Sequence, residues 1–461
     1  MQHHFNGDCC YNLSEEFPTK YDPKDPEILS KIVDGYKSKI VGEENNIKFL
    51  FCACISKDLP KEYRLSAIIT SQSSAGKSNL VNTVLEPFKD DVIDYTDYTP
   101  AFLKRQEMIM NGKILKLEQM EKTNDKNQVT LSTLKFLLSE GMLKVGLVER
   151  NEKGKNTPQT LMVTGIPVFI STSTNFNIDP ESLNRTFLMQ IDETESQTKK
   201  IVSHILDKYK TLRINDSWPQ ELKELKKLAN AYKGLAHQIT DIIIPFANKL
   251  LDRIPTGNLT IRRDLAKILN LTAVIAFIHT SKRIRIQDND GKHFIVDQWA
   301  NTEKRYTYAL IAEPSDFKEA LAIAGTTIKQ TLNKLNESSM EIYDKFIQVY
   351  DSKQYENGTL DGALSPSKEG VTVREMASKL KKSDNRTREL MNQLWSGGYL
   401  SREKTKSREY VYFPTEKKFD DINVEDIEFT KEELDQWTEN QVDKHVEKLT
   451  VLYPKDRVVV S

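Results

Sequence analysis

The chain is poor in cysteine, has no long hydrophobic run and shows no excess of charge of either sign. Its 461 residues include four cysteines and carry a formal net charge of −1 at pH 7. So few cysteines predict reduced thiols rather than a disulfide framework. No apolar stretch approaches the about 20 residues that span a bilayer, so we expect no transmembrane helix. Because the N-terminus is polar, we also expect no signal peptide and an intracellular, cytoplasmic protein.

Charge is balanced over the whole chain but uneven along it. Residues 371–418 contain 12 Lys/Arg and 6 Asp/Glu, a local net charge of +6, whereas residues 420–447 contain 11 Asp/Glu and 2 Lys/Arg. A basic segment of this kind can approach DNA through its phosphates. The acidic segment predicts a solvated or partly disordered tail.

Hydrophobic periodicity predicts an α/β region followed by a mainly helical one. We expect a polar segment at 1–45, an α/β nucleotide-binding core at 46–200, a helical region at 201–335, a linker and basic unit at 336–418, and a tail at 419–461. Helices are predicted at 42–58, 77–88 and 129–141, and strands at 63–70, 90–98, 112–120 and 166–175. β-Hairpins are predicted at 143–165, around a Gly- and Asn-containing turn, and at 283–297, around Asp-Gly.

The stretch ITSQSSAGKSNLV (69–81) ends like a phosphate-binding loop. In such a loop, backbone N–H groups and a helix start bind phosphates, lysine reaches the β- and γ-phosphates, and a hydroxyl binds Mg²⁺. A chance Gly-Lys-Ser at a helix start is the alternative, and Ser71 stands where the motif's first glycine is expected. The residues predicted to contact ATP are Ser71, Gln72, Ser73, Ser74, Ala75, Gly76, Lys77, Ser78 and Asn79, with Mg²⁺ on Ser78.

Two further polar sites follow buried strands. Glu118 comes directly after the apolar run at 114–117, where a carboxylate can hold magnesium, usually through water. Many ATPases place a water-polarising glutamate at the next position, which here is Gln119; Glu121 offers a substitute carboxylate. The strand at 166–175 ends in Thr174 and Asn175, which could bond the γ-phosphate or the attacking water. The alternative is that all of these are ordinary polar residues at strand ends.

The order of these parts resembles an AAA+ ATPase, and within that class the minichromosome maintenance (MCM) helicase module. LEQMEKTND (117–125) resembles its Walker B run, which assigns Glu118 to the magnesium position and Gln119 to the catalytic glutamate position. The hairpin at 143–165 sits where the family has a pre-sensor hairpin, and STSTN (171–175) sits at sensor 1. DPESLNRTF (179–187) resembles the arginine-finger segment, which implies Arg185. The lid helix beginning LTIRR (259–263) implies Arg262 as sensor 2, with Arg263 as its rival.

The resemblance covers residues 65–325 and implies the whole fold class: an α/β AAA+ P-loop core with a parallel sheet between helices, an α-helical lid and a C-terminal winged-helix domain. It implies ATP hydrolysis coupled to DNA translocation in a homo-oligomeric, hexameric ring, because an arginine finger acts on a neighbour's γ-phosphate. Ser71 and Gln119 depart from the family pattern. The segment before residue 65 has no counterpart of the MCM N-terminal barrel and zinc knuckle, so the chain resembles the shortened helicase-like ATPases of mobile elements and viruses.

Basic residues predict two DNA contacts. At the tip of the first hairpin, Arg150, Lys153 and Lys155 could grip single-stranded DNA in the pore, although a merely solvated tip is the alternative. At 371–414, two helices and a basic strand pair are typical of a winged helix on duplex DNA. The first helix is capped by Thr372, and the second is capped by Ser383 or Asp384 and ended by Gly397 and Gly398. Arg386 and Arg388 would face a groove, and Arg402, Lys404, Lys406 and Arg408 would reach phosphates.

Trp395 and Tyr399 are predicted to lie in the core of this unit rather than to stack on bases, and a protein partner for the winged helix stays open. The sequence therefore favours an ATP-dependent ring helicase. One alternative is an ATP-gated winged-helix regulator with little hydrolysis, which Gln119 favours. Another is an AAA+ remodeller that acts on protein.

Overall fold

The computed structural model describes residues 20–71, 76–95, 108–118, 137–138, 140–150, 156–174, 186–210, 217–254, 261–288, 308–333, 335, 337–357, 369–405, 409–419, 428–434, 436–437, 440 and 449–452. The chain divides into two compact units. Unit 1 comprises Met1–Asp252, Arg262–Ala324 and Val424–Ser461, and unit 2 comprises Arg253–Ile261 and Gly325–Asn423. No helix within the described ranges is long and apolar enough to cross a membrane.

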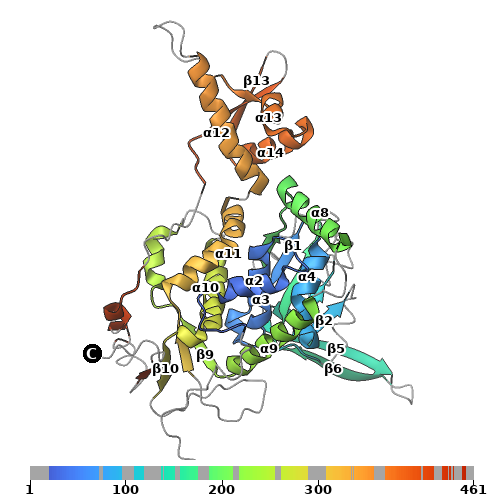
Figure 1. Cartoon of the computed structure of the whole chain (residues 1–461), viewed down its shortest axis with the longest axis vertical. Coiled ribbons are helices and arrows are strands. Elements are labelled where there is room, and N and C mark those ends of the chain that lie inside the picture. Colours follow the sequence, from blue (N-terminus) through green and yellow to red (C-terminus); the bar gives the residue numbers. More distant parts are fainter. Residues whose placement is uncertain are drawn as a thin grey trace, which may run out of the picture. The chain divides into compact units, whose positions relative to one another are not determined.

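A five-stranded parallel sheet lies in unit 1 (Figure 1). Its order is β2 (Val92–Tyr95), β4 (Ile114–Leu117), β7 (Val168–Ser173), β1 (Ala67–Thr70) and β8 (Phe187–Gln190). The three central strands are buried along their whole length, as expected for parallel strands covered on both faces. The predicted α/β class with a parallel sheet between helices is confirmed. β8 was not predicted, because it is only four residues long and begins at the last residue of the segment assigned to the arginine finger.

The two faces of this sheet pack on different layers. On one face, the Phe49 ring of α3 (Glu44–Ser56) lies 4.6 Å from the Phe187 ring of β8, and α3 also packs on α4 (Lys77–Leu85). On the other face, apolar strand residues form a cluster with residues from outside the sheet. Its buried members are Ile68, Met110, Leu115, Leu117, Leu137, Val163 and Phe169.

A helix that the sequence analysis missed precedes α3. The segment 1–45 was predicted to be polar and weakly patterned, but it contains α2 (Ile28–Tyr36). Its apolar side chains pack against α3 and α9 (Trp218–Ala236), and the Tyr36 ring lies 5.7 Å from the Trp218 ring. Ile28, Ile32 and Tyr36 share one helical face. That spacing was the available signal, and nine residues were too few to stand out.

The region 201–335 is less helical than predicted. It contains α9, α10 (Ile261–Ile278) and α11 (Pro314–Asn333), and α8 (Glu195–Lys210) leads into it. It also contains β9 (Ile239–Ile243), β10 (Arg285–Asp288) and β11 (Tyr308–Ile311), which form a four-stranded sheet with β15 (Leu449–Leu452) in the order β15-β10-β11-β9. β10 is the first strand of the hairpin predicted at 283–297, and the second lies outside the described residues. Short 3-10 helices lie at Lys61–Tyr63, Glu86–Asp91, Ala247–Arg253 and Thr280–Lys282.

Two pieces of the chain after residue 419 pack within unit 1. One of them, around Leu434, lies in the acidic segment 420–447, so the prediction of a solvated tail is wrong there. β15 pairs antiparallel with β10. Leu434, with Phe429 and Trp437 beside it, packs on Ile284, Ile286 and Ile311. The apolar side chains scattered among the acidic residues explain this, because they can be buried while the carboxylates around them stay in solvent.

The hairpin predicted at 143–165 is confirmed. β5 (Met142–Arg150) and β6 (Asn156–Thr164) pair antiparallel from Met142↔Thr164 to Arg150↔Asn156, and β3 (Met108–Ile109) pairs with β6. Figure 1 shows the hairpin projecting from the body of unit 1. Gly141 and Gly165 mark its root with φ values of +66° and +92°, and Gly165 N–H donates to Gly141 O at 2.7 Å.

Replacing Gly165 with alanine should destabilise unit 1 by about 1–3 kcal/mol. A Cβ at this position would lie 2.6 Å from the Asn111 backbone nitrogen, and φ is in the left-handed region. Denaturant unfolding measures the loss. Gly234→Ala is the matched control, because Gly234 lies inside α9 and an added Cβ would meet no atom within 4 Å other than those of its own helical turns. That change should stabilise by about 0.5–1 kcal/mol, and equal effects of the two would contradict the strain argument.

Unit 2 contains the two helices and the strand pair predicted at 371–414, together with a helix that was not predicted. Its elements are α12 (Glu337–Asn357), β12 (Val371–Thr372), α13 (Val373–Leu380), α14 (Asp384–Ser396), β13 (Leu400–Lys404) and β14 (Tyr410–Pro414). The strands form an antiparallel sheet in the order β12-β14-β13. Thr372 caps α13 in a capping box and Ser383, rather than Asp384, caps α14. Leu390, Leu394, Tyr399 and Tyr412 pack in its core.

Candidate functional site

The loop after β1 turns into α4 at a glycine. Gly76 is the residue before the helix and has φ +93° and ψ 9°. This left-handed conformation is unfavourable for residues that carry a Cβ. The first N–H groups of α4 have no partner inside the helix, so they are available to an anion. Ser78 and Asn79 are exposed in this first turn. Residues 72–75 lie outside the described residues.

Lys77 folds back onto Ser71. The Lys77 side chain is buried, with the residue 9% exposed, and its Nζ donates to the Ser71 carbonyl oxygen and to Ser71 Oγ, each at 2.9 Å. Among the described non-glycine residues, only Glu43 and Lys381 have a positive φ, so Ser71 needs no left-handed backbone. Serine at this position therefore carries none of the conformational cost that the sequence suggested, and its hydroxyl gives the lysine a second acceptor.

Glu118 directly follows β4 and is half-buried. Its Oε1 accepts from Lys116 Nζ at 3.1 Å, and the same ammonium donates to Asp94 Oδ2 of β2 at 2.9 Å. Lys116 was not singled out from the sequence, where a lysine two residues before an acidic one carries no distinctive pattern. Gln119 and Glu121 lie outside the described residues.

β7 ends beside both of these sites. Thr174 follows it and is half-buried, while Asn175 lies outside the described residues. Ser171 Oγ donates to Leu117 O at 2.9 Å, and Ser71 N–H donates to Ser173 O at 3.3 Å. These bonds tie the ends of β4 and β1 to β7, which separates them.

The three predicted sites meet at one edge of the sheet. β4, β7 and β1 are parallel neighbours, with Leu117 opposite Ser171 and Thr70 opposite Ser173. Because strands lie about 4.8 Å apart and Glu118 is two residues behind the other two in register, Ser71, Thr174 and Glu118 lie within about 12 Å of one another. Ligands of open α/β sheets bind outside this carboxyl edge. A cationic lysine, a helix N-terminus, a hydroxyl and a carboxylate are the groups that a magnesium-bound triphosphate needs.

Any magnesium here would be held by few protein ligands. No group of three or more His, Cys, Asp or Glu side chains that could hold a metal ion occurs in the described part of the chain. Ser78 and Glu118 are the residues that fit the ion, with phosphate oxygens and water completing its shell. This is the usual way in which proteins bind Mg²⁺ together with a nucleotide.

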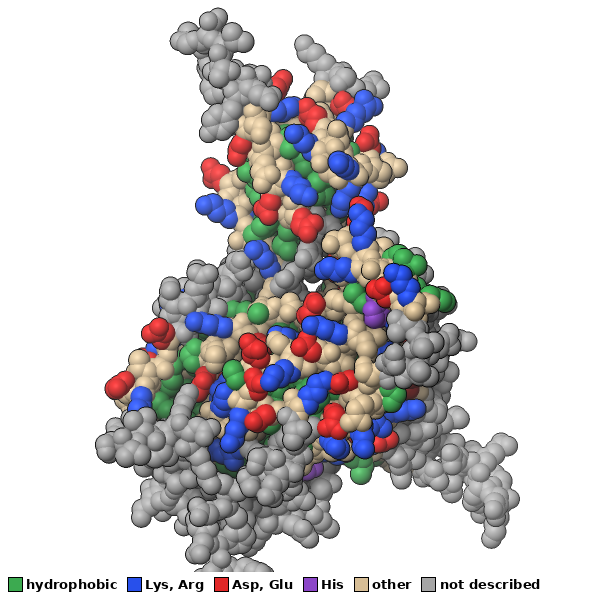
Figure 2. Space-filling model, viewed as in Figure 1, with side chains coloured by type: hydrophobic (Ala, Val, Ile, Leu, Met, Phe, Trp, Pro, Cys, Tyr) green, Lys and Arg blue, Asp and Glu red, His purple; other side chains and the backbone are tan. Residues whose placement is uncertain are grey.

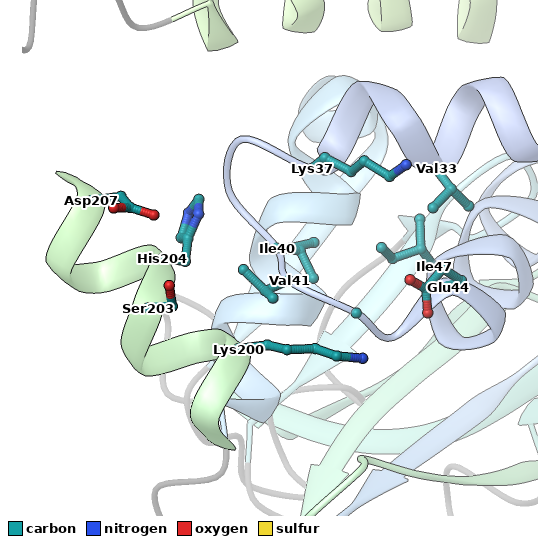
Figure 3. Close-up of a pocket in the computed structure, with 11 residues that line it drawn as sticks. Val33, Lys37, Ile40, Val41, Glu44, Ile47, Lys200, Ser203, His204 and Asp207 are labelled. Atoms are coloured by element: carbon teal, nitrogen blue, oxygen red, sulfur yellow. The ribbon is translucent and has the colours of Figure 1, made fainter. Parts of the chain in front are cut away.

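A cavity of about 440 Å³ lies between α8 and the turn that joins α2 to α3 (Figure 3). Its apolar wall is formed by Val33, Ile40, Val41 and Ile47, and its polar wall by Lys37, Glu44, Lys200, Ser203, His204 and Asp207. Figure 3 shows Lys200 extending from α8 towards the facing turn. His204 Nε2 is buried and has no hydrogen-bond partner among the described residues.

This cavity borders the same edge of the sheet. Ile191 N–H, just after β8, donates to Thr70 O at 3.3 Å, and Asn46 Nδ2 donates to Gln190 O at 2.8 Å. Gln197 Nε2 of α8 donates to Val41 O. Sequence reasoning missed the cavity, although Gly42 was a signal: it has φ +70°, and an added Cβ would lie 2.5 Å from Gln197 Nε2.

Of the arginines assigned by resemblance, the structure describes Arg262 and Arg263. Arg185 lies outside the described residues. Arg262 and Arg263 are exposed in the first turn of α10. Further along α10, Lys267 Nζ donates to Thr186 O at 3.4 Å and lies 5.5 Å from the centre of the Phe187 ring. Thr186 and Phe187 are at the amino end of β8, so these contacts are at the opposite edge of the sheet from Ser71.

Of the predicted DNA-binding residues of the hairpin, the structure describes Arg150, at the far end of the ladder. Arg150 forms the last pair of the ladder, with Asn156, and Lys153 and Lys155 lie outside the described residues. At a rise of about 3.4 Å per residue, β5 extends about 27 Å from the root. At the other end, Val163 packs with Leu115 and Leu117, the residues on either side of Lys116.

The basic residues of unit 2 have different surroundings. Arg386 and Arg388 are exposed on α14, and Arg386 Nη1 donates to Glu389 at 3.1 Å. Lys404 is exposed on β13, and Lys406 and Arg408 lie outside the described residues. Contacts of these residues with a DNA groove or with phosphates therefore stay predictions.

Arg402 is held between two aromatic rings. Its Cζ lies 3.5 Å from the Trp395 ring centre and 4.3 Å from the Tyr410 ring centre, and its Nη1 donates to Asn392 at 2.9 Å. A phosphate would have to compete with these contacts. Trp395 is 41% exposed, so its predicted place in the core is wrong, whereas Tyr399 is buried as predicted.

Comparisons with known proteins identify no family for this chain. No protein-family model and no curated protein matches the sequence. Among solved structures, the chain is similar to JCV helicase crystallised with a small acetamide compound, at 12% identity and a TM-score of 0.25, over 52% of this chain and 63% of that one. The chain therefore spans less than two thirds of that helicase chain. A similarity this low assigns neither a fold nor an activity, so function is argued from the site itself.

Proposed function

We propose that this chain is an AAA+ ATPase of the shortened MCM-like kind, which forms a ring, translocates on DNA and acts as a replicative helicase. The observation that carries the proposal is the meeting of Lys77, Glu118 and Thr174 at one carboxyl edge of a parallel sheet. The three sites were inferred separately along the sequence, and 40 residues or more separate each from the next. Residues that follow neighbouring parallel strands always meet at this edge; what supports the proposal is that here they are a lysine, a carboxylate and a hydroxyl, the groups that a magnesium-bound triphosphate needs.

In this proposal, backbone N–H groups at Gly76–Asn79 and the Lys77 ammonium bind the β- and γ-phosphates, and Ser78 and Glu118 hold Mg²⁺. The ion neutralises charge on the phosphates. Water attacks the γ-phosphorus, the bond to the β–γ bridging oxygen breaks, and ADP and phosphate leave. Thr174 and Asn175 hold the water or the γ-phosphate. Gln119 can orient the water, as a glutamine does in some GTPases. Glu121 is the next carboxylate along the chain after Glu118 and could take the proton of the water.

The cavity beside β8 supports a nucleotide rather than a free phosphate. Its volume of about 440 Å³ is within the usual range of small-ligand sites. The half-buried Val41 gives apolar surface for the flat face of a base.

The arginines support assembly. Arg262 lies on a helix that contacts the amino end of β8, away from the Lys77 edge of the same chain. Together with Arg185, it could instead reach the γ-phosphate held by a neighbouring copy. A ring in which every copy supplies these arginines to the next would give each site its missing positive charge.

The hairpin and unit 2 supply the contacts with DNA. Val163, at the hairpin root, packs on Leu115 and Leu117. A movement of Glu118 upon hydrolysis could be transmitted to the hairpin through these contacts. Its basic tip would hold single-stranded DNA in the pore. In unit 2, α12, α13, α14 and the pair β13–β14 follow the order of a winged helix, which would place Arg386, Arg388 and Lys404 on duplex DNA.

Replacing both Lys153 and Lys155 with alanine should weaken the binding of single-stranded DNA about tenfold at low salt, because two phosphate contacts are lost. The slope of affinity against salt should also become shallower, and ATP binding should not change. Fluorescence anisotropy of a labelled oligonucleotide measures both. Lys223→Ala/Lys227→Ala, which removes two exposed lysines of α9, is the control of equal charge. Equal losses of DNA affinity in the two variants would show that the hairpin tip makes no specific contribution to DNA binding.

The rate of ATP hydrolysis with and without single-stranded DNA tests the proposed function. A helicase of this kind hydrolyses ATP faster on DNA, and the gain disappears in the hairpin variant. Gln119 favours the alternative of an ATP-gated DNA-binding regulator, which would bind ATP but show little turnover under either condition. DNA binding that does not depend on the hairpin, combined with hydrolysis that DNA leaves unchanged, would favour a remodeller of proteins.

A further inference from the structure

Lys116 is a charged side chain inside the central sheet. It occupies the third position of β4, is 4% exposed, and has Leu115 and Leu117 as chain neighbours. Side chains alternate along a strand, so Lys116 points to the opposite face from these two leucines, the face on which Glu118 also lies. An apolar residue at such a position would avoid the cost of burying a charge. The lysine therefore calls for an explanation other than packing.

The ammonium of Lys116 is shared between two carboxylates. Its Nζ lies 2.9 Å from Asp94 Oδ2 and 3.1 Å from Glu118 Oε1. Asp94 is directly opposite Lys116 in the β2–β4 ladder, and its side chain is 56% exposed, whereas that of Glu118 is 34% exposed. The lysine is thus anchored on one side by an acid from the sheet edge and faces, on the other, the residue assigned to magnesium.

We infer that Lys116 is a positioning residue that orients Glu118 and sets how strongly the site takes up Mg²⁺. It holds one oxygen of the Glu118 carboxylate and leaves the other to the ion. Its positive charge also opposes a second cation, so that Mg²⁺ enters with the triphosphate rather than before it. This inference rests on the proposed function.

The sign of the effect follows from charge. Asp94, Lys116 and Glu118 together carry −1; without the lysine charge they carry −2, and without the aspartate charge they carry 0. A divalent cation responds strongly to such a change. The opposing effect, loss of the hydrogen bond that orients Glu118, is smaller because this carboxylate is one third exposed and solvent screens it. Removing the lysine charge should therefore strengthen Mg²⁺ binding, and removing Asp94 should weaken it.

The test is the Mg²⁺ concentration that gives half-maximal equilibrium binding of a fluorescent ATP analogue, which needs no hydrolysis. Lys116→Met should lower this concentration about tenfold, and Asp94→Asn should raise it several-fold. Lys113→Met is the matched control. Lys113 precedes the same strand at its amino end and pairs with Asp91 at 3.3 Å, so its loss should leave the Mg²⁺ midpoint unchanged.

Opposite shifts in Lys116→Met and Asp94→Asn, with no shift in Lys113→Met, are the expected result. If Lys116→Met does not fold, the Mg²⁺ midpoint of Asp94→Asn decides alone. The Asp94 side chain is exposed, so this substitution should be tolerated. Midpoints equal to wild type, or shifts in the same direction, overturn the inference while wild-type ATP binding stands. A wild type that binds no nucleotide at any Mg²⁺ concentration overturns the proposed function and this inference with it.

Discussion

Replacing Lys77 with alanine should reduce ATP binding and hydrolysis by at least about 100-fold, the order of magnitude lost with a preorganised donor to a developing charge. Lys77 is buried against Ser71, where its ammonium is held ready for the phosphates by two acceptors at 2.9 Å. Equilibrium binding of labelled ATP and steady-state release of phosphate measure the two effects.

The matched control is Lys89→Ala. Lys89 is an exposed residue of the 3-10 helix Glu86–Asp91 that follows α4, and its loss should leave both quantities unchanged. The unfolding temperature of Lys77→Ala should stay near that of wild type, since the two hydrogen bonds lost to Ser71 lie at the loop and the apolar core stays intact. If Lys77→Ala keeps ATP affinity and turnover, the loop after β1 is not a phosphate site.

Replacing Arg185 with alanine should lower hydrolysis about 10³-fold while ATP binding is kept, because an arginine finger stabilises charge that develops only during phosphoryl transfer. Arg185 lies outside the described residues, so this prediction rests on the resemblance to the MCM module. Rates of phosphate release at saturating ATP, together with the affinity for a labelled analogue, separate the loss of chemistry from a loss of binding.

Mixing the two inactive variants tests whether the arginine acts between copies. At an interface between Lys77→Ala and Arg185→Ala subunits, one copy supplies an intact phosphate loop and the other an intact arginine. Activity should therefore return in the mixture, although each variant alone is inactive. A mixture that stays inactive while it forms mixed oligomers would place Arg185 outside the neighbour's site.

Local sequence patterns were enough to predict the elements that carry the site. A buried strand, a Gly-Lys-Ser turn and a helix follow one another within about 25 residues, and the structure has β1, Gly76 and α4 in that order. Glu118 was found because it ends an apolar run, and the β5–β6 hairpin because apolar and polar residues alternate. In each case the signal and the structure it specifies lie in the same short stretch of chain.

Contacts between distant segments could not be predicted in this way. Nothing local indicates that β7 lies between β4 and β1, or that α2 and α8 enclose a cavity beside β8. The pairing of Lys116 with Asp94 depends on the register of β2 and β4, and 18 residues of chain separate these two strands. Arg402 shows the same limit, because its stacking on Trp395 and Tyr410 depends on how α14 meets the β13–β14 pair.

Ser71 illustrates how the structure changes the weight of a sequence motif. The expected glycine suggested a strained turn, and its replacement by serine counted against a phosphate loop. In the structure the backbone at Ser71 continues the β1 ladder towards Ser173, so no special conformation is required. A departure from a motif weakens a prediction only if the missing residue was needed for its conformation.

A particle image of the chain with a non-hydrolysable ATP analogue, Mg²⁺ and single-stranded DNA tests the central claim most directly. The account predicts a closed ring with the phosphates of the analogue on Gly76, Lys77 and Ser78 of one copy, Arg185 of the next copy beside them, and DNA at the hairpin tips in the pore. Separate single chains with no nucleotide density beside Lys77 would contradict it.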